Sequence, residues 1–387
     1  MAEVEFGFQL ATRVVFGAGA VSGAGKEAAS LADKRVLLIT DAGLVAAGLA
    51  DAVVEAMKRN GLDCPVFSGI SANPRDQECQ DAAAAARETG AEAIVGLGGG
   101  SAIDVAKAAA ALVTNGGRVK DWEDPIRLEK DPLPLLAVPT TAGTGSEVTW
   151  VAVITDEEQH YKMTLLDTRI AANVAVLDPE LTISLPPRLT AATGMDALVH
   201  AIEAYTCKAS NPVSDALALR AVELVGGALR RAVADGADRG ARSDMLLGSL
   251  LAGISFGNAD VGAVHCLGES LGGVFDTPHG LACAVFLPAV LEFNAVADPA
   301  RHARVAAALG VETSGMADSE AAAAAVAAVR GLMSDIGIPS LRRLQELSAD
   351  DTEKVARLSA EHVCSPDNAR TVTYDDYLAL LRATYAA

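Results

Sequence analysis

The alternation of wholly apolar segments with amphipathic segments is the feature that most constrains the fold of the first half of the chain. RVLLITD (35–41), AEAIVGLGGGS (91–101) and LPLLAVPTT (133–141) are apolar at nearly every position, and helical patterns such as GLADAVVEAMKRNG (48–61) lie between them. A strand without an apolar and polar alternation is buried on both faces, which is typical of a parallel sheet with helices on each side. The pattern therefore predicts a Rossmann-like α/β domain.

Two further patterns complete this half. VEFGF (4–8) and RVVFG (13–17) predict an N-terminal hairpin or a pair of edge strands, and EVTWVAVITDEEQHYKM (147–163) predicts a second strand pair. After Pro186 and Pro187 the strand pattern ends, and Ala- and Leu-rich helical patterns continue to residue 387. We therefore expect an α/β domain over 1–185 and an all-α domain over 186–387.

Charge and composition limit the classes of partner and the cellular location to be expected. The net charge of −19 disfavours nucleic acid as a partner, because a phosphate backbone requires clustered Lys and Arg. The N-terminal residues lack the pattern of a signal peptide, and no apolar run approaches the ~20 residues of a membrane span. Six cysteines without CxxC pairs predict free thiols, a cytoplasmic location and, for most of them, simple packing roles.

Glycines at a strand end indicate a cofactor site. Gly98, Gly99, Gly100 and Ser101 connect a predicted strand to a predicted helix, where backbone N–H groups can meet a phosphate. The alternative is that the glycines serve a steric purpose and that Ser101 and Asp104 form a plain capping box. This alternative stays open because GLGGGS is not the GxGxxG fingerprint. A second small-residue loop, TTAGTGSE (140–147), makes a nucleotide crevice the better interpretation.

Asp41 stands at the end of another predicted strand. Its carboxylate can accept hydrogen bonds from an adenosine ribose, and it would repel a 2′-phosphate. NAD is therefore favoured over NADP, although Asp41 precedes the glycine loop rather than following it as in the usual Rossmann order.

Four side chains have the chemistry of metal ligands. Asp196 and His200 are four residues apart in a predicted helix and so project from one face, and His265 and His279 follow in Gly-containing segments. One histidine alone is more often a core or surface residue, but three of the six in the chain fall here. Three imidazoles and a carboxylate suit Fe(II), Zn or another divalent transition metal rather than magnesium or calcium. The other histidines, at 160, 302 and 362, are predicted to be surface residues.

The motifs GGGSAIDVAK, PTTAGTGSEVT, GMDALVHAIEAY and TPHG resemble, in order and spacing, those of the iron-containing (group III) alcohol dehydrogenases, including lactaldehyde reductase and 1,3-propanediol dehydrogenase. The resemblance implies a dehydroquinate synthase-like architecture, with an NAD-binding domain, a helical metal domain and a cleft between them. It implies hydride transfer between nicotinamide C4 and a small primary alcohol or aldehyde held by the metal, and a homodimer or larger homo-oligomer.

The resemblance also assigns residues. The metal ligands fall on Asp196, His200, His265 and His279. The cofactor contacts fall on Asp41, Gly98, Gly99, Gly100, Ser101, Asp104, Thr140, Thr141, Thr144 and Lys162. The substrate pocket includes Val151, Phe256 and Cys364.

One position departs from the family pattern. Many members carry a histidine, assigned to proton relay, four residues after the ligand at His265, and this chain has Glu269 there. Three roles remain open for Glu269: proton transfer, selection of substrates with hydroxyl or cationic groups, and orientation of a ligand histidine. A reductase of carboxylated substrates related to maleylacetate reductase, or a non-catalytic NAD-binding protein, would fit the same scaffold.

Overall fold

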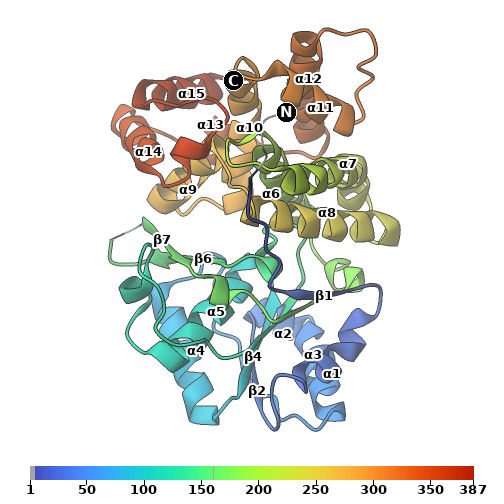
Figure 1. The fold of residues 1–387 in the computed structure, drawn as a ribbon, viewed down its shortest axis with the longest axis vertical. Helices are drawn as coiled ribbons and strands as arrows, with labels where there is room; N and C mark the ends of the chain where they lie inside the picture. The colour runs from blue at the N-terminus through green and yellow to red at the C-terminus, as the bar shows by residue number, and fades with distance from the viewer. Residues whose placement is uncertain (1–4, 160) are drawn as a thin grey trace. The chain divides into compact units, whose positions relative to one another are not determined.

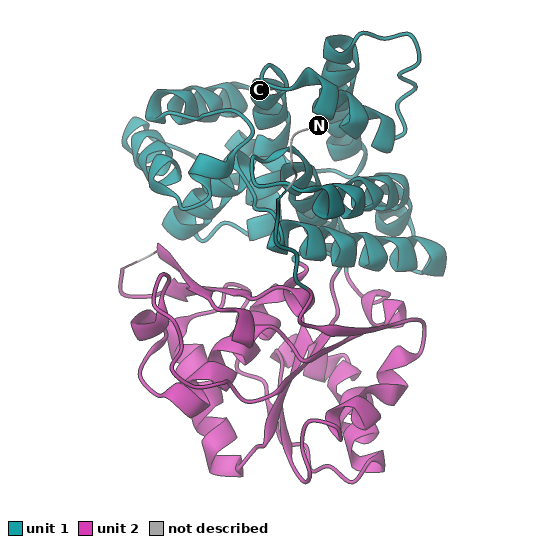
Figure 2. Cartoon of the chain, in the orientation of Figure 1, with its two compact units in different colours: residues 1–9, 142–144, 186–387 teal, residues 10–141, 145–185 magenta. Residues whose placement is uncertain are grey.

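The computed structural model describes residues 5–159 and 161–387. They form two compact units (Figure 2). One unit consists of Leu10–Thr141 and Gly145–Leu185, and the other consists of the residues up to Gln9, Ala142–Thr144 and Pro186–Ala387. Two short segments that lie early in the sequence thus pack with the second, helical unit.

The first unit is built on a six-stranded sheet in the order β1-β8-β5-β4-β2-β3. Every neighbouring pair in this sheet is parallel, which confirms the predicted fold class. The strands are β1 (Arg13–Phe16), β2 (Val36–Ile39), β3 (Val66–Phe67), β4 (Ala93–Gly98), β5 (Leu135–Pro139) and β8 (Val174–Leu177).

Alternate side chains of the strands enter two separate cores. Leu37 and Ile39 of β2 pack in a core with α4 (Asp76–Thr89) and α5 (Gly100–Asn115). Val36 and Leu38 pack instead with α1 (Ala24–Ala28) and α3 (Leu49–Arg59). Figure 1 shows these two pairs of helices on opposite sides of β2 and β4. Both faces of the sheet are therefore apolar, which explains the continuous apolar runs in the sequence.

The predicted strand pair after residue 147 is confirmed. It forms an antiparallel hairpin of β6 (Val151–Asp156) and β7 (Tyr161–Leu166). The predicted N-terminal hairpin is wrong: β1 pairs in parallel with β8, and residues 5–12 contain no strand. The side-chain amide of Asn258 replaces a strand partner there, because it hydrogen-bonds both the N–H (2.6 Å) and the carbonyl (2.8 Å) of Gln9.

The second unit is helical throughout its long C-terminal segment, as predicted. Its helices are α6 (Pro187–Thr206), α7 (Pro212–Ala234), α8 (Arg239–Gly257), α9 (Ala263–Phe275), α10 (His279–Ala295), α11 (Pro299–Ala308), α12 (Asp318–Asp335), α13 (Leu341–Leu344), α14 (Ala349–Glu361) and α15 (Tyr374–Ala386). α6 is buried on almost every side and packs against α7, α8 and α10. Within the described residues, no helix combines the length and apolarity needed to span a bilayer.

Candidate metal and cofactor sites

Three helices of the second unit bring the four predicted ligands together. Asp196 and His200 lie one turn apart on α6, His265 lies in the first turn of α9, and His279 is the first residue of α10. Asp196, His200 and His265 are 2%, 5% and 2% exposed. Such burial of polar side chains is costly unless they meet each other or a cation.

Three pairs of ligand atoms lie close enough to share a cation. Asp196 Oδ1 lies 3.4 Å from His279 Nε2 and 4.0 Å from His265 Nε2. His265 Nε2 lies 3.0 Å from His200 Nε2. Donor atoms that each sit about 2.1 Å from one metal ion are at most about 4.2 Å apart, so all three distances are compatible with coordination.

The protonation preferences also suit a cation. Burial lowers the pKa of His200 to about 3, so this imidazole is neutral. His200 Nδ1 is buried, and it has no hydrogen-bond partner among the described residues. Burial acts to raise the pKa of Asp196, but the three imidazoles outweigh it and hold that pKa well below its usual range. A carboxylate oxygen together with imidazole nitrogens is a donor set that divalent transition metals bind.

Glu203 is a site residue that the sequence analysis missed. Its Oε2 lies 2.6 Å from His265 Nδ1, and since a carboxylate only accepts, Nδ1 must donate. This fixes the tautomer of His265 and leaves the Nε2 lone pair for a metal. Burial lowers the pKa of His265, but the Glu203 carboxylate outweighs it and raises that pKa overall. The available signal was the spacing, because Glu203 follows His200 by three residues and so shares its helix face.

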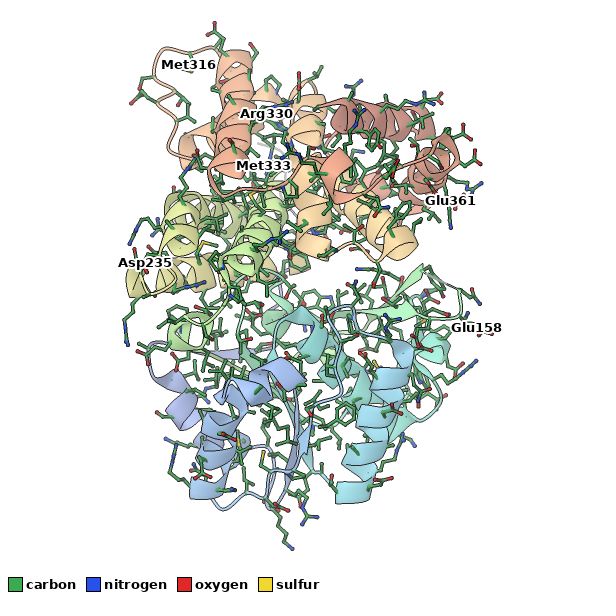
Figure 3. The ribbon with its side chains drawn as sticks, turned by 180° about the vertical axis from the view of Figure 1, so that it is seen from behind. Glu158, Asp235, Met316, Arg330, Met333 and Glu361 are labelled. Carbon is green, nitrogen blue, oxygen red and sulfur yellow. The ribbon has the colours of Figure 1, made fainter. Side chains whose placement is uncertain are left out.

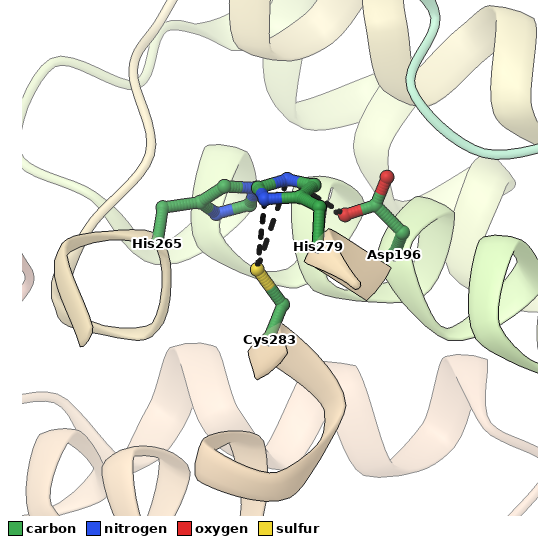
Figure 4. Close-up of side chains that lie close together, drawn as sticks. All are labelled: Asp196, His265, His279 and Cys283. Carbon is green, nitrogen blue, oxygen red and sulfur yellow. Dashed lines mark hydrogen bonds and ion pairs between the residues drawn. The ribbon is translucent and has the colours of Figure 1, made fainter. Parts of the chain in front are cut away.

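Cys283 is a second addition to the cluster. Its sulfur lies 3.8 Å from His279 Nε2, and together with Asp196, His265 and His279 it forms a group able to hold a metal ion. Figure 4 shows these four side chains pointing toward one another. Gly268 leaves room for the thiol, because a Cβ there would lie 2.6 Å from the sulfur. Simple packing roles were predicted for most of the cysteines, and the place of Cys283 one turn after His279 was the overlooked signal.

Gly280 permits the close approach of α10 to α6. A Cβ at this position would lie 2.3 Å from the carbonyl oxygen of Ala192. Any side chain there would push His279 away from Asp196, so the close approach of the two helices requires glycine.

The predicted cofactor loops of the first unit lie at the carboxyl ends of adjacent strands. Gly98 ends β4 and is paired in register with Pro139 at the end of β5, and Thr140 N–H donates to Gly98 O at 2.9 Å. Asp41 follows β2, which flanks β4 on the other side. From β2 the chain continues to β3 on one side of the sheet, and from β4 it continues to β5 on the other side. The direction in which successive strands are added therefore reverses between β2 and β4. Ligands of open α/β sheets bind at such a reversal.

Individual contacts refine the roles of the loop residues. Asp41 caps α2 (Ala42–Ala46), because its carboxylate accepts from Leu44 N–H at 2.9 Å. The alternative capping box of Ser101 and Asp104 is not formed. Ser101 Oγ donates to Ala72 O, and Asp104 accepts from Ser146 Oγ (2.6 Å) and Val153 N–H (3.1 Å). Gly100 begins α5 without a side-chain cap, which leaves its first N–H groups directed out of the helix.

A buried lysine that was not singled out in the sequence anchors the second loop. Lys107 is 0% exposed, and its ammonium donates to Ser146 Oγ (2.9 Å), Thr149 Oγ1 (3.3 Å) and Val151 O (2.7 Å). Burial lowers its pKa to about 8. Lys107 thereby ties the end of TTAGTGSE to the start of β6.

The remaining predicted residues are distributed over both units. Phe256 of α8 stacks on His200, with ring centroids 4.4 Å apart. Cys364 and Thr144 also belong to the helical unit, whereas Val151 and Lys162 belong to the β6–β7 hairpin of the first unit.

The predicted surface positions of two histidines are wrong. His302 of α11 is 0% exposed, and its Nδ1 donates to the carbonyl of Asp298, the N-cap residue of that helix. His362 is half-buried and lies 3.1 Å from Glu269 through Nε2. The third, at position 160, lies outside the described residues.

Comparison with known proteins decides the family. The family description "Iron-containing alcohol dehydrogenase" matches residues 11–179, and "Fe-containing alcohol dehydrogenase family, C-terminal" matches residues 190–385. The chain belongs to the iron-containing alcohol dehydrogenase family. The predicted family and fold class are thus confirmed.

Individual relatives are similar over nearly their whole length. The chain is 38% identical to NAD-dependent methanol dehydrogenase of Bacillus methanolicus (95% of this chain, 97% of the relative). It is 40% identical to choline dehydrogenase of Bacillus subtilis (90% and 88%). Among solved structures, a 1,3-propanediol oxidoreductase superposes with a TM-score of 0.96 at 37% identity (98% and 100%).

Proposed function

We propose that this family member is an NAD-dependent alcohol dehydrogenase and aldehyde reductase that acts on a small primary alcohol or aldehyde at a divalent metal. The observation that carries the proposal is the cluster of one carboxylate and three imidazoles, with ligand-atom distances of 3.0, 3.4 and 4.0 Å. The similarity to an NAD-dependent methanol dehydrogenase supports both the cofactor and the reaction.

Asp196, His200, His265 and His279 are the proposed metal ligands, and Fe(II) is the proposed metal. When bound, the metal supplies Lewis acidity that polarises the C–O group of the substrate. Glu203 orients His265, and Phe256 stacks on His200, so both rings are held before any ligand arrives. Phe256, Val151 and Cys364 are the proposed substrate-pocket residues.

The proposed NAD site uses the three loops at the strand ends. The pyrophosphate is proposed to meet Gly98, Gly99, Gly100 and Ser101 at the N-terminus of α5, because helix N-terminal N–H groups attract phosphate. Asp104, Thr140, Thr141, Thr144 and Lys162 are proposed to complete the contacts with the cofactor. Asp41 favours NAD, since its carboxylate would repel a 2′-phosphate.

The substrate class is proposed from charge. The ion-pair partners of Asp196 in the described chain are the three ligand imidazoles, with no Arg or Lys among them. A carboxylated substrate would need such a cation, so we favour neutral short alcohols, including diols. A cationic alcohol is the second candidate, because one relative is a choline dehydrogenase and Glu269 adds negative charge near His200 and His265.

Glu269 is proposed to transfer the proton that accompanies hydride transfer. It lies one turn after His265 on α9, and its side chain is 16% exposed, so it can exchange protons with water.

We further propose a cytoplasmic homo-oligomer, a dimer or larger. All six cysteines are free thiols, which fits a reducing compartment. β1 is an edge strand of its sheet, and Phe6, Phe8 and Leu10, which precede it in the sequence, are exposed. Exposed apolar side chains and an unpaired strand edge each favour association with a second copy. Light scattering that shows a monomer at micromolar concentration would contradict this part.

The central test is NADH oxidation by chelator-stripped protein that is reloaded in turn with Fe(II) and Zn. The substrate panel contains glycolaldehyde, lactaldehyde, betaine aldehyde as the cationic probe and succinate semialdehyde as the carboxylated probe. We expect turnover that depends on the metal, with neutral aldehydes preferred. NADH binding without turnover on any aldehyde would refute the enzymatic proposal, and preference for the carboxylated aldehyde would refute the charge argument.

A further inference from the structure

Glu269 has a specific partner that lies far from it in sequence. His362 Nε2 lies 3.1 Å from Glu269 Oε2, although 93 residues separate the two. His362 is the residue directly after α14, whereas Glu269 lies on α9. Because the carboxylate only accepts, Nε2 of His362 donates the hydrogen bond.

The other nitrogen of His362 is also committed. The backbone N–H of Cys364 donates to His362 Nδ1 at 3.3 Å. Nδ1 therefore acts as the acceptor and Nε2 carries the hydrogen, which fixes one tautomer and one ring orientation. With both nitrogens engaged, the imidazole is placed to hold the Glu269 carboxylate rather than to take a proton from a substrate itself.

The pair is mostly buried but keeps a small exposed surface. The side chains of His362 and Glu269 are 17% and 16% exposed. The neighbouring residue Glu361 shows the contrast, because its side chain is exposed and lies at the surface in Figure 3. A hydrogen bond in a sheltered position orients a carboxylate more firmly than an exposed ion pair does.

We propose that His362 is the positioning residue of Glu269: it holds the carboxylate in the one orientation from which the substrate's hydroxyl proton is exchanged with solvent. The inference rests on the proposed dehydrogenase function. In alcohol oxidation the C–H bond breaks with its electron pair going to oxidised nicotinamide, and the O–H bond breaks with its proton going to Glu269 and then to water. In aldehyde reduction both transfers run in reverse.

The test is a double-mutant cycle on the metal-loaded enzyme. Glu269→Gln keeps the size of the side chain but cannot accept the proton, and we expect kcat to fall about 100-fold. His362→Leu removes the donor, and we expect kcat to fall about tenfold with KM for NAD and for the alcohol unchanged. His362→Gln keeps an N–H donor and should restore kcat to within about threefold of wild type.

The decisive variant is the double substitution. If His362 acts only through Glu269, adding His362→Leu to Glu269→Gln lowers kcat no further. A solvent isotope effect on kcat should also grow in His362→Leu, because proton transfer becomes slower. Glu361→Gln, at the exposed neighbouring position, is the matched control and should behave as wild type.

Three outcomes would overturn the proposal. They are additive losses in the double variant, equal losses in His362→Leu and His362→Gln, or a lower melting temperature with kcat unchanged. If His362→Leu does not fold, the kcat of His362→Gln is compared with that of wild type and with that of Glu269→Gln. The role of His362 is refuted if His362→Gln is as slow as Glu269→Gln. Failure of the proposed function is distinct, since wild-type enzyme would then show no metal-dependent turnover at all.

Discussion

Replacement of Glu203 tests how the metal centre is built. One carboxylate accepts three hydrogen bonds: from His265 Nδ1 (2.6 Å), Val264 N–H (2.7 Å) and His265 N–H (3.3 Å). The two backbone groups belong to the first turn of α9, whose N-cap Gly262 has no side chain to cap it. Asn368 Oδ1 satisfies the N–H of Ala263 in the same way. Glu203 thus caps α9 and orients a ligand at once.

Glu203→Gln keeps the size of the side chain almost unchanged, but the amide has one accepting end and one donating end. Either a backbone N–H of α9 loses its acceptor, or His265 Nδ1 must become an acceptor and place its hydrogen on Nε2. The first outcome costs about 1–3 kcal/mol of folding stability. The second blocks the nitrogen that faces Asp196 and should weaken metal binding by about 10–100-fold.

Two measurements separate these effects. Urea unfolding of the metal-free protein gives the loss of folding stability, and competition with a chelator gives the metal affinity. Glu223→Gln is the matched control, because this side chain is 49% exposed and its ion-pair partner in the described part of the chain is Arg220 on the same helix. We expect no change in either quantity there.

The reasoning would be refuted if Glu203→Gln bound metal as tightly as wild type and unfolded at the same urea concentration. A loss of folding stability with unchanged metal affinity would support the capping of α9 by Glu203. It would refute the role of Glu203 in orienting His265.

Three further predictions concern other positions. Burial raises the pKa of Glu147 from an ordinary 4.5 to about 7, so the folded state favours the protonated carboxyl. The free energy of unfolding should therefore fall by about 3 kcal/mol as the pH rises from 4.5 to 7. Glu147→Gln should abolish this fall, as measured by urea unfolding. Gly280→Ala should cost about 1–3 kcal/mol and weaken metal binding, because its Cβ would meet the Ala192 carbonyl, as calorimetry and chelator competition would show. Asp41→Asn keeps an acceptor for Leu44 N–H but removes the charge, so the ratio of kcat/KM for NADP to that for NAD should rise about tenfold.

Each of these has its own control and contrary outcome. Unchanged pH dependence in Glu147→Gln would assign the fall to other groups. Gly227→Ala, on an exposed face of α7 with no atom near its Cβ, should instead stabilise by about 0.5–1 kcal/mol. A cofactor ratio unaltered in Asp41→Asn, while Leu44 remains capped, would remove the charge argument for NAD.

Local patterns in the sequence were sufficient for much of the fold. The continuous apolar runs around Leu37, Val95 and Ala137 predicted a sheet buried on both faces, since such runs can be accommodated only between two layers of helices. RVVFG was β-prone because of its valines and phenylalanine, but its partner β8 lies about 160 residues away. No local pattern reports pairing at that distance.

The ligands at Asp196 and His200 could also be found locally, because a spacing of four residues places them on one helix face. Cys283 and Glu203 obey the same spacing rule relative to His279 and His200. They were missed because a thiol and a carboxylate on a helix have many other uses, and only their burial beside the imidazoles shows their role.

The sequence by itself therefore determined the family, the layered α/β domain, the helical domain and the four metal-ligand candidates, since these depend on residue types at short, regular spacings. Only the tertiary structure decided which residues support the ligands: Glu203 behind His265, Cys283 beside His279, and His362 against Glu269. The physical reason is that hydrogen bonds between helices depend on how the helices pack, and the spacing of residues along one chain segment carries no record of that packing.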